Sequence, residues 1–368
     1  MKNPPDYLLA AVILLLVLIG ISTVYSSSYI YAEKIQGNSY YFFSRHLLSA
    51  VFGIVMLAAG FLTRPQFIMR WYKAGIVFSL ILLAVVLVPG IGRKVGGARR
   101  WISFGFIKLQ PSTIAQFCLI IYLARSLAEK KDRLHLFSAG VLPGLLISGF
   151  LAFIILLEPD VSTSIILVVI SLLMFLLAGV PLLHIAVIGV SAVPFLVLLL
   201  ETRHYVLDRI LALNPASDPY GRGYHLLQSL RAFRNGGIFG VGPGNSLQKS
   251  GNLPEAHTDF VFSVIGEETG LIGCLFIIIL FVFFFLRSLR IARSQNSQEE
   301  FLLACGITFM ITIQALVHIL VTIGLAPTTG VPLPFVSYGR TALLINLFAA
   351  GVLLNLSRNL QAKQVFHE

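Results

Sequence analysis

The chain has 368 residues, of which 57% are hydrophobic and 12% are charged, and its formal net charge is +11 at pH 7. Soluble domains carry roughly 25% charged residues, so the composition excludes an ordinary soluble domain. Apolar runs long enough to cross a bilayer recur along the whole length. We therefore predict an all-α polytopic membrane protein in a single domain, residues 1–368. Its three cysteines lie in apolar runs and indicate packing, not a disulfide or metal framework.

Hydropathy predicts ten membrane-spanning helices. In chain order they lie near 8–27, 46–63, 73–90, 112–128, 138–157, 161–179, 183–200, 261–286, 301–324 and 340–357. The first is too long for the core of a signal peptide and is expected to remain as a helix.

Three joints between these spans are candidates for a functional surface. The joint 91–111 is basic and glycine-rich, the joint 201–258 after the seventh span is by far the longest, and the joint 325–339 contains three prolines. Irregular backbone at membrane depth is tolerated where it lines a cavity or is buried. We expect these joints to form the walls of one extracytoplasmic cavity.

The distribution of lysine and arginine sets the orientation. With both termini on one side, that side carries 13 basic residues and the other carries 14, of which 11 lie in the joints 91–111 and 201–258. The positive-inside rule applies to short loops, and on these the count becomes 13 against 3, so both termini are expected in the cytoplasm. Eleven basic residues in two outer loops indicate an anionic partner at the outer membrane surface.

Among the carboxylates, Asp259 is the first candidate for chemistry, because it stands at the mouth of a membrane helix, where a charge is costly. The alternative is an acid that stabilises the helix N-terminus. In a helix, Asp259 and Glu267 would lie roughly 12 Å apart, beyond the ~5–9.5 Å of a glycosidase acid pair. A single base for a transfer reaction is favoured. Glu267 and Glu268 are expected to face inward, while Glu158 and Asp160 are expected to orient arginines.

The basic loops offer further candidates. Arg99 and Arg100 provide planar cationic donors that suit phosphate oxygens. Trp101 fits either a sugar-stacking role or the interfacial aromatic belt. Residues 224–234 have the spacing of an amphipathic interfacial helix. The glycines between 236 and 244 would let the backbone approach a ligand closely.

Several sequence motifs occur together in these joints. They are GARRW at 97–101, QPS at 110–112, PDxxT at 159–163, GYxxxQSLxA at 223–232, GGxFGxGxGxSxQK at 236–249, LPEAHTDFxFxVIGEExG at 253–270, GLxPTTGxPLPFxSYG at 324–339 and LLNLSR at 353–358. In this order, over nearly the whole chain, they resemble the SEDS family (shape, elongation, division and sporulation). The resemblance is greatest to the division branch and its sporulation relative, with the elongation branch as the nearest alternative.

The resemblance implies a peptidoglycan glycosyltransferase that polymerises lipid II at the outer face of the cytoplasmic membrane, for septal cell-wall synthesis. The family's catalytic aspartate falls on Asp259, and the residues of its GARRW loop fall on Arg99, Arg100 and Trp101. The other motifs supply candidates for substrate binding. These are Gln248, Lys249, Glu255, His257, Ser337 and Tyr338. Lys249 and Arg340 are expected to help the arginines hold pyrophosphate, with Glu255 or His257 as the alternative base.

The same resemblance implies partners. We expect a class B penicillin-binding protein, other membrane proteins of cell division and the lipid bilayer, and no nucleic acid. A divalent cation, Mg²⁺ or Mn²⁺, could screen the pyrophosphates, although no dedicated metal cage is visible in the sequence. The alternative functions are a lipid II flippase, an elongation polymerase and a scaffold for the division machinery.

This chain departs from the family pattern at several positions. Thr113 and Gln116 replace a Glu and a Lys, Glu158 replaces a Gln, Ser162 replaces a Gly, His318 stands where Asn is common, and Arg340 replaces a Gly. The loss of Glu and Lys together removes an ion pair whole and leaves no unpaired charge.

Overall fold

The computed structural model describes residues 4–95, 98–104, 107–191, 204–216, 218–250, 253 and 255–359. Within these ranges, seven helices are long and apolar enough to cross a membrane, and three further apolar helices are shorter. The ten coincide with the ten expected spans, so the prediction of an all-α polytopic membrane protein is confirmed. The second half of the seventh span, 192–200, lies outside the described residues.

The long helices are α1 (Tyr7–Gln36), α2 (Tyr41–Leu62), α5 (Pro111–Glu129), α7 (Val161–Ala178), α11 (Val261–Arg293) and α12 (Gln298–Thr322), together with α6 (Leu142–Leu157) and the π-helical turn Phe137–Val141 before it. The shorter apolar helices are α4 (Tyr72–Leu87), Leu182–Ser191 and α13 (Arg340–Leu356). Three more helices, α3 (Pro65–Arg70), α9 (His204–Leu211) and α10 (Tyr224–Gly236), lie in the joints.

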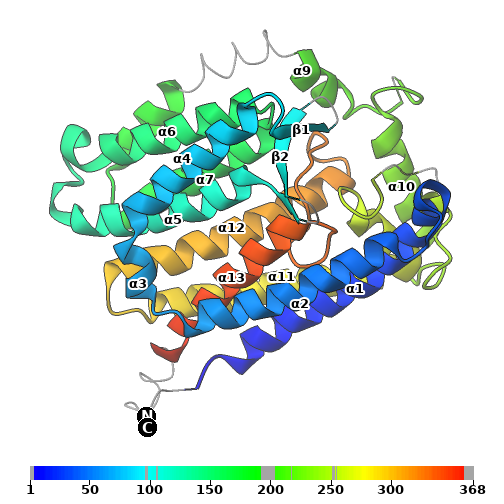
Figure 1. Ribbon diagram of the computed structural model, residues 1–368, viewed down its shortest axis with the longest axis horizontal. Coiled ribbons are helices and arrows are strands. Elements are labelled where there is room, and N and C mark those ends of the chain that lie inside the picture. The colour runs from blue at the N-terminus through cyan, green and yellow to red at the C-terminus, as the bar shows by residue number, and fades with distance from the viewer. Residues whose placement is uncertain are drawn as a thin grey trace.

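The helices form one bundle, with both chain ends at one end of it and the sheet, α9 and α10 at the other (Figure 1). At the first end, the backbone N–H of Asp6 donates to Ser357 Oγ at 2.9 Å, and Arg287 forms an ion pair with the Asp6 carboxylate. These contacts bring the two ends of the chain together on the same side of the membrane bundle.

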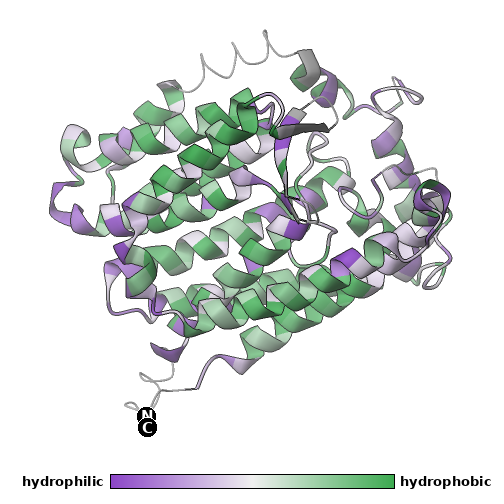
Figure 2. Cartoon of the chain, in the orientation of Figure 1, coloured by the Kyte–Doolittle hydropathy of each residue, from purple (hydrophilic) through white to green (hydrophobic). Residues whose placement is uncertain are grey.

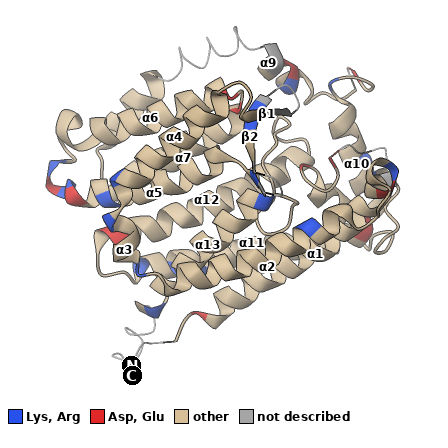
Figure 3. Cartoon of the chain, in the orientation of Figure 1, with Lys and Arg blue, Asp and Glu red and all other residues tan. Residues whose placement is uncertain are grey.

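The surface of the bundle has the pattern of a membrane protein. The middle lengths of the helices are hydrophobic in Figure 2, and most charged residues lie near the two ends of the bundle in Figure 3. Large apolar side chains such as Leu146, Ile165 and Val282 are exposed on the outer helix faces. Their exposure is expected, because lipid replaces water as the solvent there.

Small residues bring α2 and α13 into close contact. A Cβ at Gly60 would lie 2.3 Å from the carbonyl oxygen of Phe348, and a Cβ at Gly351 would lie 2.1 Å from that of Leu57. Close backbone approach through glycine is a common way to pack membrane helices, since dispersion contacts replace a hydrophobic driving force. This pairing fixes α13, which begins at the candidate site.

Helix α1 is longer than its hydropathy predicts. The expected span ends near 27, but the helix continues to Gln36 and ends at Gly37, whose φ of 61° makes it a left-handed cap. The extension carries polar residues that lower the hydropathy, and it contacts the long loop, with Lys249 Nζ 5.1 Å from the ring centre of Tyr29. Tertiary contacts therefore continue this helix beyond its apolar segment.

The joint 91–111 forms a small antiparallel sheet that the sequence did not predict. Its strands are β1 (Gly92–Val95), β2 (Ala98–Phe104) and β3 (Ile107–Leu109), in that order. The register between β1 and β2 shifts at this point, since Arg93 pairs with Trp101 and Lys94 pairs with Arg99, which leaves Arg100 as an extra residue on β2. A bulge of this kind interrupts the alternation of side chains along the strand and redirects a side chain.

Helix α11 is broken at Gly270, where φ is 68° and ψ is −164°. The backbone groups on both sides of the break are paired with the glycine-rich loop. The N–H groups of Val241 and Gly242 donate to the carbonyls of Glu267 and Glu268 at 2.9 and 3.0 Å, and those of Leu271 and Ile272 donate to Gly237 and Ile238 at 2.9 and 3.3 Å. The approach of this loop to a ligand stays a prediction, and the close contacts that the structure shows for Gly236 and Gly240 are with the backbone of α11. Its glycines allow close approach to another part of the backbone.

The predicted helix 224–234 is present as α10, but its buried face meets protein. Ser229 Oγ lies 2.5 Å from Ser263 Oγ of α11 and donates to the carbonyl of Thr322 at the end of α12, at 2.6 Å. The ring of Phe233 packs beside that of Phe262. The face of α10 that predicted an interfacial helix therefore packs against α11 and the end of α12.

The contact between the glycine loop and the helix break yields a prediction. Gly240 has a φ of 81°, and a Cβ there would lie 2.2 Å from the carbonyl oxygen of Glu268. In Gly240→Ala, backbone strain alone should lower the free energy of unfolding by about 1–3 kcal/mol. Thermal unfolding in detergent measures this loss. Gly149→Ala is the control, because Gly149 lies in α6 with nothing within 4 Å of its added Cβ. Equal melting temperatures for both variants would contradict the role given to Gly240.

Candidate active site

Asp259 lies in the turn 255–260 that leads into α11. The N–H groups of Thr258 and Asp259 both donate to the carbonyl of Glu255 at 3.1 Å, and Thr258 Oγ1 donates to Glu255 Oε2 at 2.9 Å. Beneath the turn, a small apolar cluster contains Leu253, Ala256, Phe260 and Val264. Burial of these side chains holds the turn in place while its polar residues face the outer end of the bundle.

The surroundings of Asp259 favour a base that titrates near neutrality. The side chain is half-buried, and a Cβ at Gly330 would lie 3.7 Å from Oδ2, so the carboxylate faces the loop before α13. Burial, and next the charge of Glu255, raise the pKa of Asp259 to about 7, against the opposing effects of Arg209, a hydrogen bond with Thr258, and Arg100. Such a carboxylate is ionised in part at pH 7 and can accept a proton.

A cavity of about 540 Å³ opens beside this turn. It is lined by residues from three joints, by the outer ends of α1 and α2, and by the start of α13. These residues are Tyr31, Ile35, Gln36, Tyr41, Phe42, Arg45, Trp101, Ser103, Lys108, Glu255, His257, Thr258, Tyr338, Gly339 and Arg340. Asp259 itself is not among them, although its neighbour Thr258 is.

The cavity combines cations with aromatic rings. Arg45, Lys108 and Arg340 supply positive charge, and the Arg45 guanidinium lies 3.6 Å from the ring centre of Tyr41. Cations suit phosphate oxygens, and aromatic rings suit the apolar faces of sugars. Trp101 lines the cavity, which places it where the sugar-stacking interpretation requires it.

His257, Ser337 and Tyr338 join the two loops behind the cavity. The N–H of Tyr338 donates to the carbonyl of His257 at 3.0 Å, and Ser337 Oγ donates to the carbonyl of Thr258 at 2.8 Å. The rings of His257, Phe42 and Tyr338 pack against one another, with the His257 centre 4.5 Å from that of Phe42 and 5.5 Å from that of Tyr338. Burial lowers the pKa of His257, so its ring is neutral at pH 7. Ser337 is buried and bonds to backbone, which makes its visible role the positioning of the turn.

Arg100 points away from Trp101, towards the turn between α6 and α7. Its Nε donates to the carbonyl of Glu158 at 3.2 Å, its Nη2 donates to the carbonyl of Pro159, and its Nη1 lies 3.9 Å from Asp160 Oδ1. Asp160 also caps α7 by accepting from the N–H of Thr163 at 3.3 Å. The expected orienting role is confirmed for Asp160. The side chain of Glu158 does not take part, because Arg100 contacts only its backbone carbonyl.

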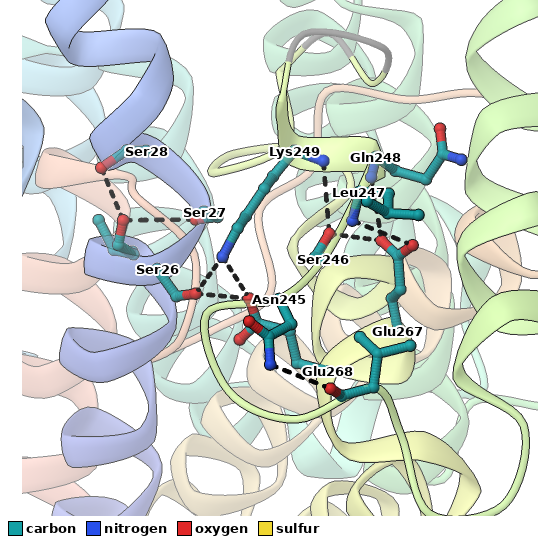
Figure 4. A network of polar contacts seen from close by, with 12 residues as sticks. Ser26, Ser27, Ser28, Asn245, Ser246, Leu247, Gln248, Lys249, Glu267 and Glu268 are labelled. Atoms are coloured by element: carbon teal, nitrogen blue, oxygen red, sulfur yellow. Dashed lines mark hydrogen bonds and ion pairs between the residues drawn. The ribbon is translucent and has the colours of Figure 1, made fainter.

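Glu267 and Glu268 both face inward, as expected (Figure 4). Glu267 is fully buried and accepts hydrogen bonds from several donors of the long loop. These are Asn235 Nδ2 at 3.1 Å, Ser246 Oγ, and the N–H groups of Leu247 and Gln248 at 3.3 and 3.2 Å. Gln248, a candidate for substrate binding, is itself buried here.

Lys249 forms an internal ion pair in the same region. Its Nζ lies 2.7 Å from Glu268 Oε1 and 2.9 Å from Ser26 Oγ, and only 1% of its side chain is exposed. Figure 4 shows the ammonium directed towards α1 and Glu268. Lys249 does not line the cavity, so substrate binding by Lys249 stays a prediction, and its visible contacts are structural.

The departures at Thr113 and Gln116 lie inside the bundle. Both are buried, and Gln116 accepts from Gln314 Nε2 at 3.1 Å while it donates to the carbonyl of Thr163 at 3.4 Å. Asn346 Nδ2 extends this set of amides by donating to Gln314 at 3.3 Å. Neutral amides therefore bond to one another at the place where the resemblance implies an ion pair, while Asn346 Oδ1 has no hydrogen-bond partner among the described residues.

Sequence reasoning missed several residues of the cavity. Arg45, Tyr31 and Tyr41 lie at helix ends, where a polar or aromatic residue is common at a membrane interface. Tyr41 and Arg45 are four residues apart on one helix face, a spacing that could have drawn attention to them. Among the described residues, no group of three His, Cys, Asp or Glu side chains could hold a metal ion.

The fold and site define a polytopic membrane protein with a cationic, aromatic-lined cavity at one end of its helix bundle and a half-buried carboxylate beside it. Residues 6–362 match the family model described as cell cycle protein, covering FtsW, RodA and SpoVE. The chain belongs to this family, the SEDS family.

Named relatives agree with this assignment. The chain is 43% identical over 357 residues to a probable peptidoglycan glycosyltransferase FtsW of Trichlorobacter lovleyi, covering 97% of this chain and 94% of the relative. It is 39% identical over 362 residues to stage V sporulation protein E of Bacillus subtilis, covering 97% and 98%.

Solved structures share the fold. A chain from the work described as "Structural coordination of polymerization and crosslinking by a peptidoglycan synthase complex" is similar with a TM-score of 0.79 and 25% identity, covering 97% of this chain and 98% of the other. RodA of Thermus thermophilus is similar with a TM-score of 0.71 and 23% identity, covering 96% and 97%.

The buried ion pair yields a prediction. Lys249→Met should destabilise the protein by about 3–5 kcal/mol, because it leaves the buried Glu268 carboxylate without a cation. The double variant Lys249→Met with Glu268→Gln should recover most of this loss. Thermal unfolding in detergent measures both.

Arg222→Gln is the control, since Arg222 pairs with Asp208 at the surface and its loss should cost less than about 1 kcal/mol. If the double variant unfolds like wild type but makes no product, Lys249 binds substrate as the sequence predicted. If Lys249→Met is as stable as wild type, the ion pair does not hold the loop.

Proposed function

We propose that this protein is a peptidoglycan glycosyltransferase that polymerises lipid II at the outer face of the cytoplasmic membrane. The observation that carries the proposal is Asp259, a half-buried carboxylate beside a cavity lined by cations and aromatic rings. The names of its relatives support the same activity and favour a role in septal synthesis during cell division.

The chemistry follows from the residues at the cavity. Asp259 would remove the proton of the acceptor sugar hydroxyl, whose oxygen then attacks the anomeric carbon of the growing strand. The bond from that carbon to the pyrophosphate oxygen breaks, and polyprenyl pyrophosphate leaves as an anion. Arg45, Lys108 and Arg340 would stabilise this charge, and Trp101 would support a sugar ring.

The roles of the remaining candidates are narrower in this proposal. Arg100, which lies on β2 and contacts the 158–160 turn, would favour the ionised form of Asp259, because its positive charge lowers the pKa of that carboxylate. Glu255 and His257 line the cavity and remain the alternative bases. Arg99 lies two residues before Trp101 on β2 and would bind the pyrophosphate together with the cations of the cavity. A divalent cation among the pyrophosphate oxygens remains part of the proposal.

We also propose that both termini lie in the cytoplasm and that the three joints form the extracytoplasmic cavity. The meeting of the chain ends at Asp6 and Ser357, at the end of the bundle away from the sheet, supports this orientation. A class B penicillin-binding protein would crosslink the product, which agrees with the synthase complex described for a similar structure.

The first test replaces the base. Asp259→Asn keeps the size of the side chain and removes its basicity, so polymer formation from labelled lipid II should fall by at least about a hundredfold. The assay uses purified protein with its penicillin-binding partner, and product is separated on a gel. Asp132→Asn, an exposed aspartate at the opposite end of the bundle, is the control and should behave like wild type.

Polymer from Asp259→Asn at the wild-type rate would show that Asp259 is structural and would direct attention to Glu255 or His257. A variant that moves lipid II across vesicles yet never polymerises it would separate transport from polymerisation. Growth of depleted cells on the variant would favour a scaffold.

The second test uses pH. Asp259 can act as a base only when ionised, so the polymerisation rate should rise with pH through about 7, the raised pKa of this group. Glu255→Gln removes a negative charge that raises this pKa, so its profile should shift to lower pH. Rates measured between pH 5 and pH 9 decide the matter, and a profile that Glu255→Gln leaves unmoved would separate Glu255 from Asp259.

A further inference from the structure

The carboxyl group of Glu158 is buried in an unusual setting. Glu158 follows α6 at the turn into α7, none of its surface is exposed, and neither carboxyl oxygen has a hydrogen-bond partner in the described part of the chain. A buried carboxylate without a donor is costly, whereas a neutral carboxylic acid is tolerated far better.

Arg100, a cation beside this turn, forms its hydrogen bonds with groups other than the Glu158 carboxyl. Arg100 directs its Nε and Nη2 to the backbone carbonyls of Glu158 and Pro159, and its Nη1 to Asp160 Oδ1. The side chain of Glu158 receives none of these hydrogen bonds. Asp160 is engaged on its other sides as well, through the N–H of Thr163 and through Gln110 Nε2 at 3.4 Å.

The charges around this turn reach the candidate base. Glu158 faces Asp160 on its own turn and Arg100 on β2, and burial, followed by Asp160, raises its pKa to about 9 against the effect of Arg100. Asp259 in turn faces Glu255, Arg209 and Arg100. Arg100 is therefore a cation that pairs with Asp160 and whose charge also acts on Glu158 and, less than that of Arg209, on Asp259.

We propose that Glu158 is a positioning residue for the polymerisation reaction: as a neutral acid behind Arg100, it leaves the guanidinium charge to Asp160 and Asp259. As a carboxylate it would compete for that charge and draw the guanidinium out of its backbone contacts. This role rests on the proposed function, in which Asp259 is the base. The protonation state of Glu158 can be measured through the stability of the protein, without any enzymatic activity.

The first experiment measures that protonation through stability. Folding raises the pKa of Glu158 from its ordinary value of 4.5 to about 9, so a proton must be taken up on folding and the cost grows with pH between these values. Glu158→Gln, a neutral side chain of the same shape, removes the cost. Its melting temperature in detergent should exceed that of wild type at pH 7, with a difference that widens towards pH 9 and vanishes near pH 4.5.

Glu33→Gln, an exposed glutamate, is the control and should show no such trend. A Glu158→Gln protein that melts below wild type at pH 7 would mean that Glu158 is ionised and paired with Arg100. That result would overturn the proposal.

The second experiment measures polymer formation from labelled lipid II against pH. Wild type should lose activity above about pH 9 as Glu158 ionises, whereas Glu158→Gln should keep its activity there. Both proteins should share the rise near pH 7 that belongs to Asp259. A merely structural role for Glu158 would not remove the alkaline limb of the profile.

The same alkaline loss in both proteins would overturn the positioning role. If wild type with its partner forms no polymer at any pH, the proposed function fails and the positioning role fails with it. In that case the melting data still decide whether Glu158 is neutral, so the two failures are distinguishable.

Discussion

The break in α11 at Gly270 organises the end of the bundle that carries the sheet and α10 (Figure 1). It leaves backbone groups of a membrane helix without partners in their own helix, and the loop 237–242 pairs with them. The two glutamates just before the break are buried. This is tolerated because donors of the long loop bond to Glu267, and Ser26 of α1 and Lys249 donate to Glu268. The long loop, α1 and α11 are thereby joined immediately below the turn that carries Asp259.

The carboxyl groups near the site differ in what surrounds them, and this difference sets their roles. Glu267 receives several hydrogen bonds and serves as an anchor for the loop. For Asp259, the effects of Arg209, Thr258 and Arg100 only partly oppose burial, which raises the pKa to about 7. A carboxylate with this pKa can accept a proton near neutral pH. Neither carboxyl oxygen of Glu158 has a hydrogen-bond partner among the residues that the structure describes, and burial favours its neutral form.

The cavity also draws on the short joint between the first two expected spans, residues 28–45, which hydropathy alone does not mark as part of a site. The ends of α1 and α2 contribute Tyr31, Tyr41 and Arg45, which stand opposite the sheet and the loop before α13. A site built between helix ends and loops can receive a substrate with a lipid tail in the bilayer and a headgroup outside it. The overall fold is shared with a solved chain that is similar with a TM-score of 0.79 and 25% identity.

The sequence by itself determined the ten spans, the three joints that meet at the cavity, Asp259 as the leading candidate and the inward direction of Glu267 and Glu268. These follow from local hydropathy and from the cost of a charge at a membrane helix. Only the tertiary structure decided that Lys249 pairs with Glu268 and Ser26, the latter 223 residues away, and that Arg100 turns from Trp101 towards Asp160. The physical reason is that a buried charge takes its partner from whatever the fold brings beside it, and separation along the chain carries no information about that partner.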